Sequence, residues 1–223
     1  MIPQFTNTSL LTTALTHRSA LNEVGTLSNE SNERLEFLGD AVLELIATEF
    51  LYEKFPEQPE GILTAYRSAL VKTNTLAKIA AQLDLGNKLY MSKGEEATGG
   101  RTNSSLLADT MEAIIGALYL DQGIEVVRTF LHTELFVEID DILTNKLYKD
   151  AKSHLQEIVQ SLGFDTPTYE VIAAEGPDHD KQFTVNAVVD GKTIGTGVGK
   201  SKQRAQQAAA EKALQKYPDT NTI

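Results

Sequence analysis

The stretch NERLEFLGDAVL, residues 32–43, decides the fold, because it predicts both a helix and the side chains that the helix presents. Its apolar residues recur at spacings of three and four, which is typical of an amphipathic helix. At about 100° per residue, four carboxylates share one stripe of this helix: Glu33, Glu36, Asp40 and Glu44. The opposite side of the helix is apolar: Leu35, Leu38, Val42, Leu45 and Ile46. Only Arg34 lies near the stripe, whereas an ordinary solvated face mixes in Lys and Gln.

A second stretch, LLADTMEAIIGALYL at residues 106–120, repeats this arrangement. Asp109 and Glu112 are three residues apart on one helix face, with Ala113 and Gly116 as small neighbours. The rest of this helix is apolar, and burying two carboxylates there is costly unless a cation meets them. If both acidic stripes face one cleft, the site suits a hard divalent ion such as Mg²⁺ or Mn²⁺.

Two interpretations of the acids stay open at this point. Each single acid could be solvated, or could pair with Arg67, Lys72 or Arg101. The chain has no Cys, and its four His residues are scattered singly, so a nucleophile and base pair is poorly supported. Carboxylate clusters that hold divalent ions are typical of enzymes in which water attacks a phosphodiester.

The length of 223 residues, 41% of them hydrophobic, allows one large domain or one core with a small appended domain. The pattern is helical up to about residue 145. Breakers at 55–61, 85–87 and 94–100 separate candidate helices near 32–54, 61–71, 74–83 and 104–121, and Val126–Leu143 closes this part. The N-terminal domain is therefore expected to be mainly α.

After the polar segment 145–150 the periodicity changes from 3.6 to 2. A helix over Ala151–Leu162 is followed by strands near Tyr169–Ala174, Phe183–Val189 and Lys192–Val198, with Asp190-Gly191 as a hairpin turn and Ser201 as the cap of a closing helix. The order α-β-β-β-α predicts a small α+β module. We expect domains at 1–145 and 150–218, joined by a linker at 146–149.

The net charge of −11 would argue against a nucleic-acid ligand, but the charge is unevenly distributed. Residues 1–148 carry 11 basic and 21 acidic side chains, whereas residues 149–217 carry nine of each. Residues 200–216 contain five basic side chains and a single acidic one, Glu211, so the module contains a basic helix.

The N-terminal twenty residues lack the basic and apolar regions of a signal peptide, and no apolar run approaches the roughly 18 residues of a membrane span. The absence of Cys fits a reducing compartment. We expect a soluble, cytoplasmic protein without a membrane partner.

NERLEFLGDAVL resembles the signature of bacterial ribonuclease III. Three further stretches agree: THRS at 16–19, PEG at 59–61 and LLADTMEAIIGALYLD at 106–121. The resemblance implies that Glu36, Asp40, Asp109 and Glu112 hold the metal, with Asp40 and Glu112 catalytic. It implies that Glu33 and Glu60 are supporting acids of the cleft. It gives no role to Glu44, and we expect His17 and Arg18 to serve structure.

The same resemblance implies an endoribonuclease that cleaves double-stranded RNA with Mg²⁺, or with Mn²⁺ in its place. The implied products have 5′-phosphate and 3′-hydroxyl ends with short 3′ overhangs, as in the processing of rRNA and other structured precursors. The implied assembly is a homodimer through the nuclease domain, each of whose sites cuts one strand. No small-molecule cofactor is expected.

The C-terminal module resembles a double-stranded RNA-binding domain in KDAKSHLQEIV at 149–159 and QFTVNAVVDGKTIGTGVGKSK at 182–202. Such domains recognise A-form shape through phosphates and 2′-hydroxyls. The resemblance implies these RNA-binding residues: Gln156, Glu157, His179, Lys200, Ser201, Lys202 and Arg204. Where many such domains have KKxAK, this chain has Gln203 and Gln206, which predicts weaker binding. Arg101 and Ser105 are further candidates for phosphate contacts.

Two other functions remain as alternatives. A catalytically idle RNA-binding dimer would not need the complete set of four acids. A metal-dependent phosphohydrolase acting on small nucleotides would have no use for the RNA-binding module, and an HD-type hydrolase would need His-Asp pairs, which the sequence lacks.

Overall fold

The computed structural model describes residues 1–23, 28–177 and 181–216. The chain divides into two compact units, Met1–Tyr148 and Lys149–Ile223, each with a hydrophobic core of its own. On one side of the junction, Tyr148 packs edge to face on Tyr66 of the first unit, with 4.6 Å between the ring centroids. On the other side, Lys149 forms an ion pair with Glu157 of the second unit.

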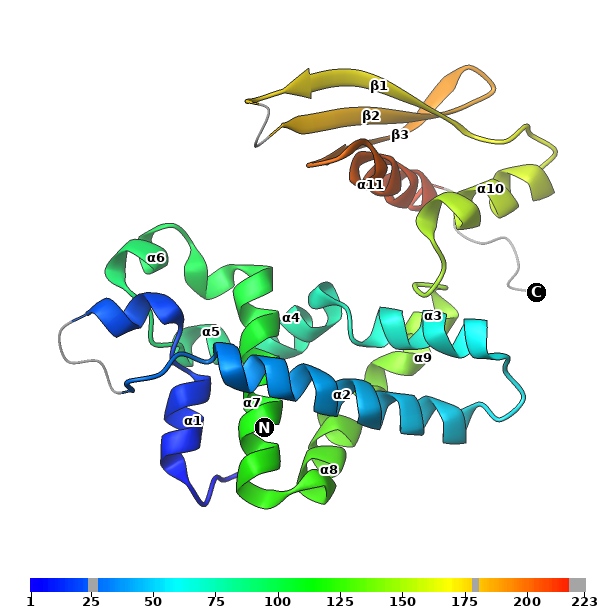
Figure 1. The fold of residues 1–223 in the computed structure, drawn as a ribbon. Coiled ribbons are helices and arrows are strands. Elements are labelled where there is room, and N and C mark those ends of the chain that lie inside the picture. Colours follow the sequence, from blue (N-terminus) through cyan, green and yellow to red (C-terminus); the bar gives the residue numbers. More distant parts are fainter. Residues whose placement is uncertain (24–27, 178–180, 217–223) are drawn as a thin grey trace. The chain divides into compact units, whose positions relative to one another are not determined.

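Helices build the first unit (Figure 1): α1 (Thr8–Ala14), η1 (Arg18–Asn22), α2 (Glu33–Lys54), α3 (Glu60–Leu70), α4 (Thr73–Gln82), α5 (Leu85–Lys88), α6 (Lys93–Ala97), η2 (Gly100–Thr102), α7 (Ser104–Gln122), α8 (Ile124–Glu134), η3 (Phe136–Glu138) and α9 (Ile139–Thr144). The mainly α prediction is confirmed, and the four long helices lie where the periodicity placed them.

Short helices correct the sequence prediction in four places. The expected breakers at 85–87 and 94–100 contain most of α5, most of α6 and the first residue of η2. Caps such as Ser92, which accepts from the Glu95 amide, support these single turns. The apolar stretch 126–143 is interrupted at Leu135, where α8 gives way to η3 and α9. Helix α1 was not predicted.

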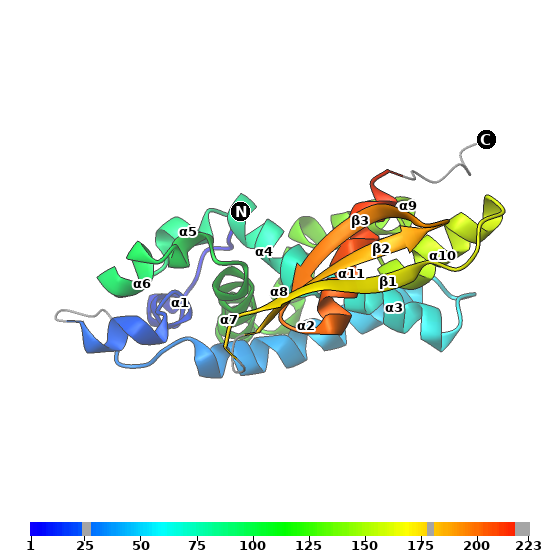
Figure 2. The same ribbon diagram turned by 90° about the horizontal axis from the view of Figure 1, so that it is seen from above.

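The centre of the first unit is the crossing of α2 and α7, which Figures 1 and 2 both show. The two helices approach backbone to backbone at a pair of glycines, Gly39 and Gly116. A Cβ atom on Gly39 would lie 1.8 Å from the carbonyl oxygen of Glu112, and one on Gly116 would lie 2.2 Å from that of Leu35. No side chain fits between the helices here.

Fully buried side chains of α2 and α7 surround this crossing, Leu43, Ile46, Ile114 and Leu118 among them. Leu45 departs from the helical-wheel prediction, because half of its surface is exposed instead of facing the core. Among the described residues, no helix is long and apolar enough to cross a membrane.

The second unit has the predicted α-β-β-β-α order: α10 (Ala151–Ser161), β1 (Thr168–Glu175), β2 (Gln182–Val189), β3 (Lys192–Gly199) and α11 (Lys202–Leu214). The strands form an antiparallel sheet in the order β1-β2-β3, and α10 and α11 cover one of its faces (Figure 1). The hairpin at Asp190-Gly191 is confirmed, with φ of 50° and 68°. Helix α11 lies close on β3, since a Cβ on Gly197 would be 2.1 Å from the Ala209 amide nitrogen.

Candidate functional site

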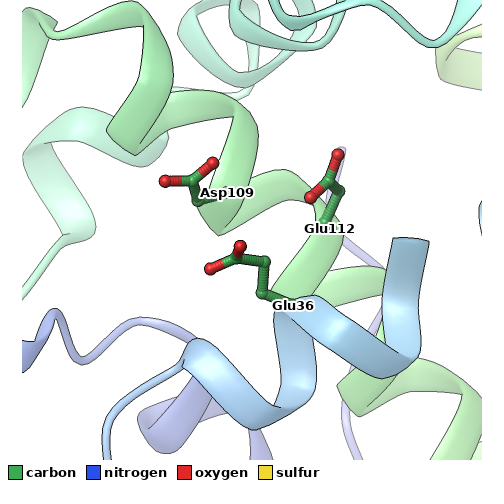
Figure 3. A group of neighbouring side chains, drawn as sticks. All are labelled: Glu36, Asp109 and Glu112. Atoms are coloured by element: carbon green, nitrogen blue, oxygen red, sulfur yellow. The ribbon is translucent and has the colours of Figure 1, made fainter.

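Helices α2 and α7 bring three of the predicted carboxylates together: Glu36 from α2, and Asp109 and Glu112 from α7 (Figure 3). One carboxylate oxygen from each lies within 4.8 Å of the other two. Glu36 precedes Gly39 by three residues and Glu112 precedes Gly116 by four, so each acid lies about one turn from the glycine crossing. The close approach of the backbones therefore sets the separation of the acids.

Burial and mutual repulsion both disfavour the charged forms of these acids. Burial, and then the charges of Asp40, Asp109 and Glu36, raise the pKa of Glu112 from 4.5 to about 7. Burial, and then Asp109, Glu33 and Asp40, raise the pKa of Glu36. Burial raises the pKa of Asp109, against a lowering by the nearby His17. A cation is what would favour three charged carboxylates here.

Two of the three basic residues that the sequence offered as ordinary partners are engaged elsewhere. Arg67 Nε lies 2.8 Å from Glu44 Oε2, and Arg101 Nε lies 2.7 Å from Glu96 Oε1. Within the described part of the chain, Lys and Arg form no ion pair with the three clustered acids. The donor set consists of carboxylate oxygens alone and fits a hard divalent cation such as Mg²⁺.

The remaining predicted acids lie outside this group of three. Asp40 is exposed, but its charge helps to raise the pKa of both Glu36 and Glu112. Glu33 is also exposed and pairs with Arg18, with 3.3 Å between Oε1 and Nη1. Glu60, at the start of α3, accepts a hydrogen bond from Thr64. The structure thus groups three of the four expected metal ligands, with Asp40 at the edge.

A pocket of about 360 Å³ opens beside the cluster, and His17, Arg18, Glu33, Glu36 and Asp109 line it. A larger cavity of about 480 Å³, between α4, α5 and the start of α7, contains none of the clustered acids. The smaller pocket is therefore the one that adjoins the clustered acids.

Of the two candidates for phosphate contacts near α7, Arg101 has a structural role and the Ser105 side chain is exposed. Arg101 donates from Nη1 to the carbonyls of Gly86 and Leu89, which holds α5 against η2. Ser105 lies in the first turn of α7, where its amide donates to the Asn103 side chain.

The predicted RNA-binding residues of the second unit lie at exposed positions on and next to α10 and α11. Gln156 and Glu157 are exposed on α10, and Lys200, Lys202 and Arg204 are exposed at the start of α11. Ser201 caps α11 by accepting from the Arg204 amide at 3.2 Å. A capped helix start with basic side chains around it suits a phosphate. His179 lies outside the described residues.

Gln206 does not lie where the departure from KKxAK suggested. Its side chain is half-buried, and its Oε1 accepts a hydrogen bond of 2.8 Å from Lys152 Nζ. The same ammonium group lies 4.9 Å from the centroid of the Tyr169 ring. Gln206 thus connects α11 to α10, whereas Gln203 is exposed.

Family comparisons agree with both units. Residues 7–139 match the family model described as ribonuclease-III-like, and residues 151–217 match the double-stranded RNA binding motif. The chain belongs to the ribonuclease III family. The resemblance drawn from NERLEFLGDAVL is confirmed, and so are the two types of domain expected of a ribonuclease III.

Curated relatives extend the ribonuclease III match over nearly the whole chain. Ribonuclease 3 from Desulforamulus reducens is 49% identical over 209 residues, which cover 94% of this chain and 85% of that protein. Ribonuclease 3 from Enterococcus faecalis is 47% identical over 215 residues, which cover 96% of this chain and 93% of that protein.

A solved nuclease domain of ribonuclease III from Campylobacter jejuni matches the first unit. It is 45% identical, the match covers 58% of this chain and 87% of that one, and the TM-score is 0.54. That structure is described as showing flexibility in the region involved in dimer formation.

Sequence reasoning missed two contributors to the site. Gly39 was not recognised as the point where α7 crosses, although a glycine inside a long apolar helix signals a close approach. His17 was assigned to structure alone, yet it lines the pocket that contains Glu36 and Asp109. A lone histidine in a sequence gives no sign of what it faces.

Proposed function

We propose that the protein cleaves double-stranded RNA by hydrolysis with Mg²⁺ held by Glu36, Asp40, Asp109 and Glu112, and that Mn²⁺ can replace Mg²⁺. Membership of the ribonuclease III family makes the protein an endoribonuclease. The products have 5′-phosphate and 3′-hydroxyl ends with short 3′ overhangs, as in the processing of rRNA and other structured precursors.

The observation that carries the proposal is the cluster of Glu36, Asp109 and Glu112, whose carboxylate oxygens lie within 4.8 Å of one another and form no ion pair with a described Lys or Arg. A divalent ion in such a site supplies a water of lowered pKa and stabilises charge on the leaving oxygen. The three clustered carboxylates would hold the ion. Asp40, exposed at the edge of the cluster, would complete the ligand set and help to orient the attacking water.

The second unit supplies the preference for duplex RNA. Its α-β-β-β-α fold matches the double-stranded RNA binding motif, which reads shape rather than sequence. In this proposal Lys200, Lys202 and Arg204 contact phosphates, and Gln156 and Glu157 reach a minor groove. The exposure of all five side chains supports it.

We further propose a homodimer through the nuclease domain, supported by an exposed apolar stripe on α2. Phe37 is 81% exposed, Tyr52 72% and Leu45 50%. Together with Ala41 these residues fall within an arc of about 80° at 100° per residue. Large apolar side chains gathered on one exposed face mark an interaction surface. In the dimer, each of the two sites cuts one strand.

The test is cleavage of a long perfect RNA duplex by the parent and by Glu112→Gln, in Mg²⁺ and in Ca²⁺, with duplex binding measured in parallel. We expect Mg²⁺-dependent cleavage by the parent and a loss of at least about 10³-fold in the variant, which still binds RNA. Glu44→Gln is the matched control, since Glu44 shares the stripe on α2 but is held by Arg67.

Other outcomes separate the alternatives. Binding without cleavage in Mg²⁺ or Mn²⁺ would favour an idle RNA-binding dimer. Hydrolysis of small nucleotides without cleavage of duplex RNA would favour a phosphohydrolase. Full activity in Glu112→Gln would remove that residue from the chemistry.

A further inference from the structure

Arg18 is a basic residue at the pocket that adjoins the clustered acids. Among the described residues that line this pocket, Arg18 is the only Lys or Arg, and Glu36 and Asp109 line the pocket with it. The Arg18 side chain is 71% exposed, so its guanidinium is open to a ligand. An arginine keeps its charge at any working pH. The pocket therefore has an anion-binding group beside the proposed cation site.

Backbone hydrogen bonds support the position from which Arg18 extends. The segment before η1 is joined to the start of α2, because the Asn32 amide donates to the Thr16 carbonyl at 2.9 Å. Thr16 and Asn32 are both buried. The same segment is joined to the one before α6, since the His17 amide donates to the Tyr90 carbonyl at 2.9 Å. Arg18 thus extends from a well-supported backbone next to the first turn of α2.

Glu33 holds the Arg18 guanidinium from one side. Arg18 Nη1 lies 3.3 Å from Glu33 Oε1. The other oxygen of that carboxylate, Oε2, accepts a hydrogen bond of 2.8 Å from Ser31 Oγ. A guanidinium has five N–H donors in a planar fork, and the bond to Glu33 uses one of them. The remaining donors suit a second anion, and the anionic groups that RNA offers are its phosphates.

The charge of the site makes such a contact useful. One divalent ion does not offset the charges of three ionised carboxylates, Glu36, Asp109 and Glu112. A strand of RNA brings one negative charge with every phosphate, so its approach to these acids is unfavourable unless a nearby cation compensates. Arg18 supplies that cation at the pocket itself.

We propose that Arg18 is a further RNA-binding residue, which contacts a backbone phosphate beside the scissile bond while Glu33 holds its guanidinium in place. This inference rests on the proposed function. It gives the THRS motif a role in substrate binding, whereas the sequence suggested a structural one. A phosphate contact adds affinity and fixes position without sequence preference. Arg18 takes no part in breaking the bond, so its loss should change KM more than kcat.

The first test compares Arg18→Gln with the parent on a duplex RNA that has a single cleavage site. In Mg²⁺ we expect KM to rise roughly 10-fold and kcat to stay within about 3-fold of the parent. In Ca²⁺, fluorescence anisotropy should show a similar loss of duplex affinity and a salt slope shallower by roughly 0.7–0.9. Arg18→Lys keeps the charge and should keep the slope. Ca²⁺ affinity without RNA, measured by calorimetry, should be unchanged in both variants.

A second test identifies the phosphate. One phosphate at a time around the cleavage site is replaced by an uncharged methylphosphonate, and duplex binding is measured in Ca²⁺. In the parent, one such replacement should weaken binding by about the same factor as Arg18→Gln. In Arg18→Gln that replacement should have little further effect, because the contact is already lost. If every replacement costs the variant as much as the parent, no phosphate pairs with Arg18 and the inference is overturned.

Arg128→Gln is the matched control, because Arg128 also pairs with acids, Glu49 and Glu125, but does not line the pocket. A structural Arg18 would only offset the charge of Glu33. Its loss would then cost nothing in a Glu33→Gln background, whereas a phosphate contact requires most of the cost to persist there. Parental KM and duplex affinity in Arg18→Gln would likewise overturn the inference. Duplex binding that depends on Arg18 in a protein that does not cleave would support the phosphate contact and contradict the proposed function.

Discussion

The Glu112 carboxyl has a pKa of about 7 in the metal-free protein, raised from 4.5 by burial and then by its acidic neighbours. Because the folded-state pKa is the higher one, the metal-free fold binds an extra proton between about pH 4.5 and 7. Its stability is therefore fully present below this window and declines as the pH rises through it. A divalent ion reverses this trend, because ligands must lose their protons to bind.

We therefore expect Ca²⁺ affinity to increase from about pH 5.5 to 7.5 and to level off above the pKa of Glu112. Calorimetry in two buffers of different ionisation enthalpy counts the protons released. In Glu112→Gln the affinity should be weaker and this rise should flatten. An unchanged pH dependence in that variant would assign the titration to another group.

Gln203 and Gln206 give a matched pair of substitutions on α11. Gln203 is exposed, so Gln203→Lys should add a phosphate contact and steepen the dependence of log affinity on log salt by roughly 0.7–0.9. Gln206 accepts from Lys152, so Gln206→Lys should place two ammonium groups together, lower the stability of the second unit and leave the slope unchanged. Fluorescence anisotropy with duplex RNA in Ca²⁺ at several salt concentrations measures both. Equal slopes in the two variants would contradict this assignment.

Which acids share a helix face was predictable from spacing, because i, i+3 and i+4 positions lie on the same side of a helix. How deeply each acid is buried was not predictable from spacing. A helical wheel gives direction within one helix, but the exposure of Asp40 and the burial of Glu112 depend on where α7 crosses α2. The contact between Gln206 and Lys152 joins positions 54 residues apart, which no local pattern reports.

Gly39 and Gly116 shape the site indirectly, because they allow α2 and α7 to approach closely. Gly39→Ala would place its Cβ 1.8 Å from the Glu112 carbonyl oxygen, so α2 and α7 must separate. We expect a loss of at least about 1–3 kcal/mol in the free energy of unfolding, with weaker Ca²⁺ binding. Urea unfolding and calorimetry measure the two effects.

Gly61→Ala is the matched control, because Gly61 also lies in a helix but its Cβ would meet nothing within 4 Å. It should be neutral or raise stability by up to about 1 kcal/mol. A Gly39→Ala protein with parental stability and Ca²⁺ affinity would show that the helices can separate without disturbing the acids.

The long helices and the strands were predictable because each repeats its period over several turns or pairs. The short ones were not, since a single turn depends on contacts from distant residues. The start of α1 is an example: the amides of Thr6 and Asn7 donate to Asp121, both at 2.8 Å, from the far end of α7. Nothing within residues 1–14 indicates that partner.

At the scale of the whole molecule, the proposed dimer depends on the exposed stripe of α2. Phe37→Asp should yield a monomer in sedimentation experiments and lose cleavage of both strands, because a buried carboxylate at the interface is costly. Val137→Asp is the matched control, since Val137 is also exposed and apolar but lies on η3. A dimeric Phe37→Asp protein would place the interface elsewhere.

The change of period near residue 145 predicted a boundary, and the compact units meet between Tyr148 and Lys149, inside the expected linker. The uneven charge also pointed to two parts with different tasks. Sequence could not show how short the free segment is, because Tyr148 is held by Tyr66, a residue 82 positions earlier.

That junction has a consequence for how the enzyme meets its substrate. Tyr148 packs on Tyr66 within the first unit, and the next residue, Lys149, pairs with Glu157 within the second, so few residues separate the two units along the chain. Once the second unit has bound a duplex, the first unit meets it at an effective concentration that the joint sets, whatever the concentration of protein in solution. A long tether would dilute this encounter roughly as the −3/2 power of its length.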